Sequence, residues 1–61
     1  MERLAYRIGE AADVLGISRS KAYELVAAGQ LPVLRVGQSM RIPADGLRAW
    51  VQRQTQENAA L

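Results

Sequence analysis

A glycine at position 16 separates two short stretches whose apolar residues have the spacing of an amphipathic helix. The first stretch covers about residues 9–15 and the second about residues 19–28. Apolar residues three and four positions apart form one stripe on each helix, and a short chain buries such stripes by packing them together. Gly16 suits the link because a residue without a Cβ readily adopts the left-handed conformation that ends a helix. The sequence therefore predicts two helices that meet at a tight turn.

Residues at the ends of the second helix support this division of the chain. Ser18 directly precedes the helix, and its hydroxyl can accept a hydrogen bond from an amide of the first turn. Gly29 follows the helix and is expected to end it in the same way as Gly16. The side chains expected to face the interior are Ala11, Ala12, Val14, Leu15, Ile17, Ala22, Leu25 and Val26.

Beyond Pro32 the spacing of apolar residues changes from a period of 3.6 to a period of about 2. Residues 33–36 and 40–42 form two β-like runs, and the glycine-containing segment 37–39 between them is typical of a hairpin turn. Residues 4–8 also alternate, but over too short a length to establish a strand. A hairpin that follows two packed helices forms a wing beside them.

A third helix is expected after the hairpin. Pro43 cannot donate to a β-ladder and is favoured in the first turn of a helix, so the strand should change to helix there. Leu47, Trp50 and Val51 recur at the spacing of a buried helical seam, in which Trp50 is the expected anchor of the core. The helix is expected to end near residue 53 or 54, where the apolar periodicity stops.

These elements predict a mainly α fold with a small β-hairpin, in the order helix, turn, helix, two-stranded wing and C-terminal helix. A chain of 61 residues has room for one domain only. We assign that domain to residues 1–54 and expect residues 55–61 to be a flexible C-terminal tail.

The composition argues against several classes of function. The chain has no cysteine and no histidine, which excludes a disulfide and a zinc site of Cys and His ligands. It lacks an apolar run long enough to span a bilayer and the apolar stretch of a signal peptide, so we expect a cytoplasmic protein without membrane contact. Six scattered acidic residues and no glycine-rich phosphate loop give no support to catalysis. We therefore expect no enzymatic activity, cofactor or metal.

Basic residues concentrate in the middle third of the chain. Residues 18–42 contain four basic residues and one acidic residue, whereas residues 1–17 contain two basic and three acidic ones. Part of this surplus lies on the second helix, on the side that its apolar residues do not use. A short helix that is apolar on one face and cationic on the other fits the major groove of DNA. The alternative interpretation is an ordinary solvated basic surface.

Six short motifs follow one another along residues 6–51, nearly the whole chain. In this order and at this spacing they resemble the excisionase-like helix-turn-helix family, whose small winged proteins are related to the DNA-binding domains of MerR-type regulators. The motifs are Ile8-Gly9-Glu10-Ala11-Ala12, Leu15-Gly16-Ile17-Ser18, Tyr23, Gly29-Gln30-Leu31-Pro32, Arg35-Val36-Gly37 and Arg41-Ile42-Pro43.

The resemblance implies a sequence-specific double-stranded DNA-binding protein of the excisionase type. Such a recombination directionality factor binds attachment-site DNA, bends it and promotes excision by an integrase. The partners implied are double-stranded DNA, an integrase or other recombinase, and further copies of the chain that bind DNA cooperatively. The expected location is the cytoplasm, at the nucleoid.

Two alternatives remain open at this point. One is a small MerR-like transcription regulator that uses the same DNA contacts. The other is a protein-interaction adaptor that has kept the fold and lost DNA binding. A net charge of only +2, and a wing without a basic residue between Gly37 and Arg41, are the features that favour the adaptor.

The expected DNA contacts come from the second helix, the wing and the N-terminal segment. Arg19 is suited to a guanine edge, which arginine binds through two hydrogen bonds, and Lys21 to phosphate. On the wing, Arg41 is favoured over Arg35 because we place it nearer the tip. Arg48, Arg53 and the tail are left as a surface for a protein partner. The predicted DNA-contacting residues are Ser18, Arg19, Ser20, Lys21 and Tyr23 on the helix, Arg35, Gln38, Ser39 and Arg41 on the wing, and Arg7 before the first helix.

Overall fold

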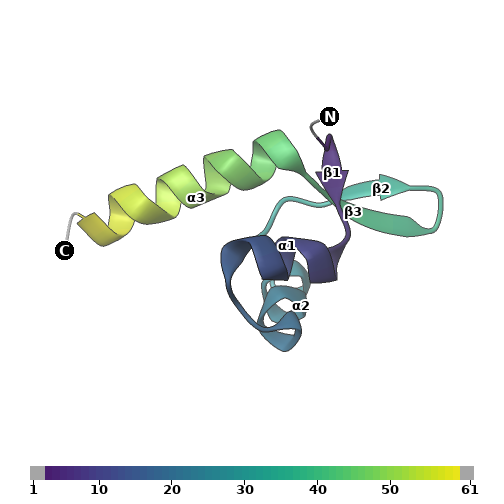
Figure 1. Ribbon diagram of the computed structural model, residues 1–61, viewed down its shortest axis with the longest axis horizontal. Coiled ribbons are helices and arrows are strands. Elements are labelled where there is room, and N and C mark those ends of the chain that lie inside the picture. The colour runs from purple at the N-terminus through teal and green to yellow at the C-terminus, as the bar shows by residue number, and fades with distance from the viewer. Residues whose placement is uncertain (1–2, 60–61) are drawn as a thin grey trace.

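The computed structural model describes residues 3–59, which contain three helices and a small antiparallel sheet of three strands (Figure 1). This architecture confirms the predicted winged helix-turn-helix. In chain order the elements are β1 (Ala5–Tyr6), α1 (Ile8–Leu15), α2 (Arg19–Ala27), β2 (Leu34–Val36), β3 (Ser39–Pro43) and α3 (Ala44–Ala59).

The turn between α1 and α2 has the backbone conformation that the sequence predicts. Gly16 has a φ of 73°, in the left-handed region. The amide of Ile17 donates to the carbonyl of Ala12 at 3.0 Å, and the amide of Gly16 donates to that of Asp13 at 3.2 Å. These two bonds form a Schellman motif, which satisfies carbonyl groups at the end of the helix. Gly29, with a φ of 72°, ends α2 in the same way.

The buried face of α1 differs from the prediction at two positions, Val14 and Ile8. Val14 was expected to face the interior but is 61% exposed. The face that packs inward consists of Ile8, Ala11, Ala12 and Leu15, at the spacing i, i+3, i+4 and i+7. Val14 lies one residue before Leu15, which turns it about 100° away from this stripe. The prediction failed because it did not place Ile8 in the helix, and Ile8 fixes the stripe's direction.

The interior is small and lies where α1, α2, β3 and the start of α3 meet. Ile42 of β3 is the largest fully buried side chain within the described residues, with none of its surface exposed. Alanines on α1 and α2 let the two helices approach closely, so little volume remains to be filled. The buried cluster comprises Ile8, Ala11, Ala12, Ala22, Leu31, Ile42 and Leu47.

The sheet has the strand order β1-β3-β2, so the central strand is β3. The N-terminal segment, which the sequence could not establish as a strand, pairs with β3 through Ala5 opposite Pro43 and Tyr6 opposite Ile42. The amide of Ala44 extends this pairing by donating to a carbonyl of the N-terminal segment at 2.9 Å. The sheet therefore has one strand more than the predicted two-stranded wing, because pairing with β3 stabilises a segment too short to be a strand alone.

α3 is longer than predicted. It continues to Ala59, so the prediction that it ends near residue 53 or 54 is wrong. The polar second half needs no buried stripe, because its Gln, Arg and Glu residues favour the helix intrinsically, and its end extends past α1 and α2 (Figure 1). Residues 60–61 of the predicted tail lie outside the described residues. Neither α3 nor any other helix within the described residues has the length and hydropathy that a membrane span requires.

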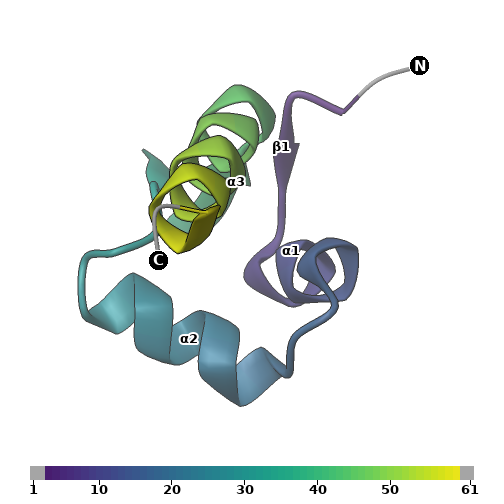
Figure 2. The ribbon, with the colours of Figure 1, turned by 90° about the vertical axis from the view of Figure 1, so that its left-hand side faces the viewer.

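The contact of α3 with the rest of the molecule is concentrated at its start. Leu47 is buried, whereas Trp50 is only partly buried and Val51 is 39% exposed. Trp50 is therefore not the anchor of the core, although it was expected to be. Ile42 and Leu47 are large buried side chains at the centre of the core. Figure 2, which looks along α3, shows α1 and α2 together on one side of it.

Gly46 allows the loop after α2 to approach the first turn of α3. A Cβ on Gly46 would lie 3.1 Å from the Cγ atoms of both Pro32 and Pro43. This is closer than ordinary van der Waals contact, and both neighbours are rigid rings. Glycine inside a helix costs roughly 1 kcal/mol relative to alanine, and the packing of two prolines against position 46 accounts for the glycine there.

Candidate nucleic-acid interface

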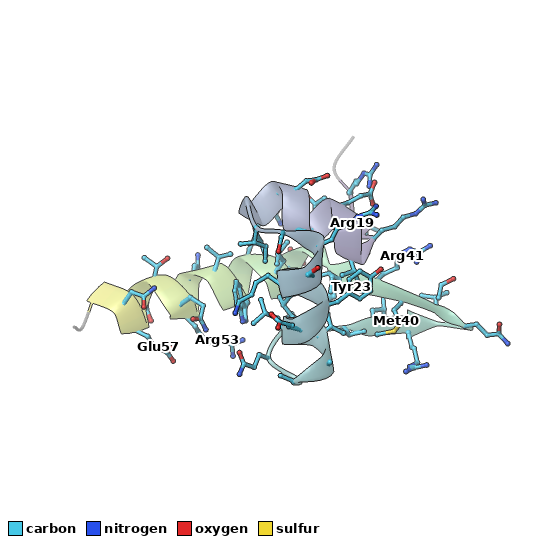
Figure 3. The ribbon with its side chains drawn as sticks, turned by 90° about the horizontal axis from the view of Figure 1, so that it is seen from below. Arg19, Tyr23, Met40, Arg41, Arg53 and Glu57 are labelled. Atoms are coloured by element: carbon cyan, nitrogen blue, oxygen red, sulfur yellow. The ribbon has the colours of Figure 1, made fainter. Side chains whose placement is uncertain are left out.

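A hollow of about 430 Å³ lies between the start of α1, the exposed face of α2 and the wing. We call it the wing hollow. Figure 3 shows Arg19 and Tyr23 of α2 beside Met40 and Arg41 of the wing. Three elements that are separate in the sequence therefore share one surface. The wing hollow is lined by Arg7, Ile8, Gly9, Glu10, Arg19, Tyr23, Gln38, Met40 and Arg41.

Two exposed residues of α2 face the wing hollow. Arg19 is the first residue of α2, and Ser18 caps the helix by accepting a hydrogen bond from the amide of Lys21 at 3.1 Å. This confirms the predicted cap. Tyr23 follows Arg19 by four residues, so the two side chains lie on the same helix face, and Tyr23 is 55% exposed. Ser20 is exposed but does not line the hollow.

Lys21 lies on another side of α2. It lines a hollow of about 380 Å³ between α2 and α3, together with Leu25, Trp50 and Gln54. Its Nζ lies 3.9 Å from a carboxylate oxygen of Glu24, one turn further along the helix. The prediction that Lys21 and Arg19 share one contact surface is therefore not met, since the two side chains line different hollows.

The register of the wing corrects the order of its two arginines. Gly37 and Gln38 form a two-residue turn, and Gly37 has a φ of 62°, the sign that the first residue of a type II′ turn requires. Arg35 pairs with Met40, whereas Arg41 pairs one step further from the turn, with Leu34. The expectation that Arg41 is nearer the wing tip is wrong, because the turn is one residue shorter than the segment 37–39.

Arg41 nevertheless has the closer relation to α2. It is partly buried, lines the wing hollow and donates a hydrogen bond from Nη1 to the carbonyl of Met40 at 2.9 Å. Gln38 at the turn also lines the hollow. Arg35 and Ser39 are exposed on the wing and do not line it. The wing thus presents one arginine and one amide toward α2, and a second arginine further out.

The segment before α1 contributes Arg7 and a polar arrangement that the sequence analysis did not find. Glu10 accepts a hydrogen bond from the amide of Arg7 at 2.9 Å and forms an ion pair with the guanidinium of Arg3. The bond from Arg3, and then that from the Arg7 amide, hold the pKa of the Glu10 carboxyl below its ordinary value. The spacing of Glu10, three residues after Arg7, is the one signal that indicates a helix start here.

The charges around the wing hollow favour an anionic ligand. Arg7, Arg19 and Arg41 line it, and Glu10 is the one acidic residue that does so among the described residues. The Tyr23 hydroxyl and the Gln38 amide add hydrogen-bond donors. No group of three side chains suited to a metal ion occurs within residues 3–59. An extended polyanion is the ligand that this arrangement suits best.

Comparison with known proteins gives matches over most of the chain. A family model described as a helix-turn-helix domain matches residues 5–55. A probable excisionase of Saccharopolyspora erythraea is 34% identical over 58 residues, which are 95% of this chain and 59% of that protein. The uncharacterized protein YvgK of Bacillus subtilis (strain 168) is 37% identical over 49 residues, which are 80% of this chain and 16% of that protein. The chain thus spans less than two thirds of either relative. No solved structure matches.

Proposed function

The chain belongs to the excisionase-like helix-turn-helix family, and from this membership we propose that it is a sequence-specific double-stranded DNA-binding protein of the excisionase type. The observation that carries the proposal is the wing hollow, which arginines from the segment before α1, from α2 and from the wing line together beside the exposed face of α2. Phosphate contacts of this kind supply most of a protein's affinity for DNA, and side chains on a helix in the major groove supply the specificity.

In the proposed complex α2 lies in the major groove and the wing follows the adjacent backbone. The major groove is wide enough for one helix, and the N-terminal end of the second helix is the part that approaches the bases in this motif. We leave Lys21 out of the contacts because it lines the α2–α3 hollow. The proposed contact residues are Ser18, Arg19, Ser20 and Tyr23 of α2, Arg35, Gln38, Ser39 and Arg41 of the wing, and Arg7.

We further propose that the protein acts as a recombination directionality factor. The described part of the chain measures 39 × 27 × 18 Å, so one copy contacts little more than one turn of DNA, which is about 34 Å long. Adequate affinity then needs neighbouring copies on adjacent sites or a partner protein. Several copies bound side by side would bend attachment-site DNA and favour excision by an integrase. The name of the Saccharopolyspora erythraea relative supports this role.

The proposal is tested by selecting bound duplexes from a random library and measuring affinity for the recovered site as salt is varied. If Arg7, Arg19, Arg35 and Arg41 each neutralise one phosphate, the logarithm of the association constant falls with the logarithm of salt at a slope of about −3.6. Failure to bind any duplex at low salt would overturn the proposal.

Recombination is tested separately with the integrase and attachment sites of an element that carries this protein. A directionality factor shifts the reaction toward excision when it is added to the integrase. DNA binding without that shift, together with changed output from a promoter near the site, would favour a transcription regulator. Capture of a protein partner by a chain that binds no duplex would favour the adaptor.

A further inference from the structure

Arg19 does not extend beyond the end of α2 but lies against the start of α1. A Cβ built on Gly9 would lie 2.8 Å from the Nε atom of Arg19 and 3.0 Å from its Nη2 atom. These distances are shorter than van der Waals contact, so the guanidinium occupies the space that a side chain at position 9 would take. Gly9 therefore permits this position of Arg19. The backbone of Gly9 is not in the left-handed region, so its conformation does not itself require glycine.

Two further arginines border the same space. Arg7 and Arg41 line the wing hollow with Arg19, and both also line an adjoining hollow of about 540 Å³ that contains Arg3 and Glu10. The two hollows thus form one basic surface. It runs from the N-terminal segment, across Gly9, to the wing.

The three arginines lack a carboxylate partner within residues 3–59. Glu10 borders the hollow, but its carboxylate is ion-paired with Arg3 and accepts a hydrogen bond from the backbone amide of Arg7. No ion pair joins Arg7, Arg19 or Arg41 to an acidic residue of the described chain. The three arginines that line this hollow carry charge of the same sign, so an anion bound in it is attracted to all three.

We infer that Arg7, Arg19 and Arg41 form a seat for the phosphate backbone of DNA, and that Gly9 is the positioning residue that keeps this seat open. The inference rests on the proposed function and commits Arg19 to phosphate, whereas the sequence alone had suggested a guanine edge. Guanidinium groups suit phosphate oxygens because their planar N–H donors make paired, charge-assisted hydrogen bonds. The seat lies where α1 and the wing flank α2, so it holds the backbone beside the groove that α2 enters.

Gly9 provides the decisive substitution. Alanine favours a helix more than glycine does, so Gly9→Ala leaves α1 at least as stable while its Cβ displaces the guanidinium of Arg19. Arg19→Ala removes the cation directly. If the seat exists, Gly9→Ala weakens DNA binding when Arg19 is present and has no further effect when Arg19 is already alanine. This double-mutant comparison separates displacement of Arg19 from any other effect of the methyl group.

The experiment measures binding by fluorescence anisotropy, with the selected duplex and an unrelated duplex, over a series of salt concentrations. Arg19→Ala is expected to weaken binding to both duplexes by a similar factor of about ten, as for one charge-assisted contact. It should also make the salt slope less negative by about 0.9. Gly9→Ala is expected to give a smaller loss of the same kind on both duplexes. The control Arg53→Ala, on α3 far from the wing (Figure 3), should leave affinity and slope unchanged.

The outcomes distinguish the seat from the proposed function. A loss caused by Arg19→Ala that is confined to the selected duplex, and disappears when one base pair is changed, would reassign Arg19 to base recognition and overturn the seat. Unchanged binding by a folded Gly9→Ala protein, checked by circular dichroism, would also overturn it while leaving the proposed function in place. Wild-type protein that binds neither duplex would overturn both.

Discussion

Arg19 and Lys21 are two residues apart on α2 but line different hollows. Arg19 borders the wing hollow, whereas Lys21 borders the hollow between α2 and α3 and lies 3.9 Å from Glu24. Both are solvent-exposed cations near the start of the helix, so net charge alone does not distinguish them. The directions in which the two side chains point do distinguish them. Arg19 is therefore expected to contact DNA, and Lys21 is not.

The first prediction concerns the salt dependence of DNA binding. Lys21→Ala is expected to leave the slope of log affinity against log salt unchanged within error, because its side chain does not face the wing. Arg41→Ala is expected to make the slope less negative by about 0.9, the effect of losing one phosphate contact. Anisotropy titrations at four or five salt concentrations measure both. An equal reduction of the slope by the two substitutions would show that Lys21 also contacts phosphate.

The end of α1, the two ends of α2 and the fold type were accessible from the sequence because they depend on local backbone preferences. Gly16 adopts the left-handed conformation that its position predicts, and Ser18 caps α2 as expected. Those features need information from only a few neighbouring residues. The change of apolar period after Pro32, and the position of Pro43, then predicted the hairpin and the third helix, and the family resemblance agrees with that order.

The features that the sequence did not predict depend on contacts between distant segments. Tyr6 forms part of a strand because it pairs with Ile42, which is far away in the chain. The side on which Lys21 lies depends on where α3 packs, and the extent of the wing turn depends on the register of β2 against β3. Neither can be obtained from periodicity within one element. Arg3 and Glu10 were missed for the same reason, since their ion pair joins the N-terminal segment to α1.

The second prediction compares the stability cost of truncating Ile8 and Val14, the two apolar residues at which the expected and observed buried faces of α1 differ. Ile8 is 6% exposed, so Ile8→Ala is expected to lower the free energy of unfolding by about 2–5 kcal/mol. Val14 is 61% exposed, so Val14→Ala is expected to change it by less than about 0.5 kcal/mol. Urea unfolding followed by circular dichroism measures both values. A larger cost at Val14 than at Ile8 would contradict the observed orientation of α1.

The third prediction tests the turn at Gly16 by a substitution that changes only the backbone preference. No atom lies within 4 Å of a Cβ built on Gly16, so alanine there meets no steric obstacle beyond its own φ of 73°. Gly16→Ala is expected to destabilise the protein by about 1–2 kcal/mol, the cost of a left-handed conformation for an L-residue. Gly16→Asn should cost less, because asparagine tolerates this region better. Thermal unfolding of the three proteins gives the order, and an alanine variant as stable as wild type would rule out the left-handed turn.

The fourth prediction concerns the pH dependence of stability that Glu10 contributes. Its ion pair with Arg3 and its hydrogen bond from the Arg7 amide lower the pKa of the folded-state carboxyl from an ordinary value of 4.5. A group with a lowered pKa stabilises the fold above its unfolded pKa and loses that contribution as pH falls through the folded pKa. Wild type should therefore be more stable than Glu10→Gln at pH 7, and the difference should shrink as pH falls below 4.5.

Urea midpoints of wild type and Glu10→Gln, measured between pH 7 and pH 3, provide the comparison for this prediction. The matched control is Asp13→Asn, an exposed carboxylate of the same helix that has no ion-pair partner within residues 3–59. That substitution should leave the midpoint nearly unchanged at pH 7. Added salt should reduce the Glu10 difference, because the pair with Arg3 is exposed to solvent and ions screen it. A difference that grows as pH falls would mean that Glu10 destabilises the fold when ionised, and the observed pairing would then be wrong.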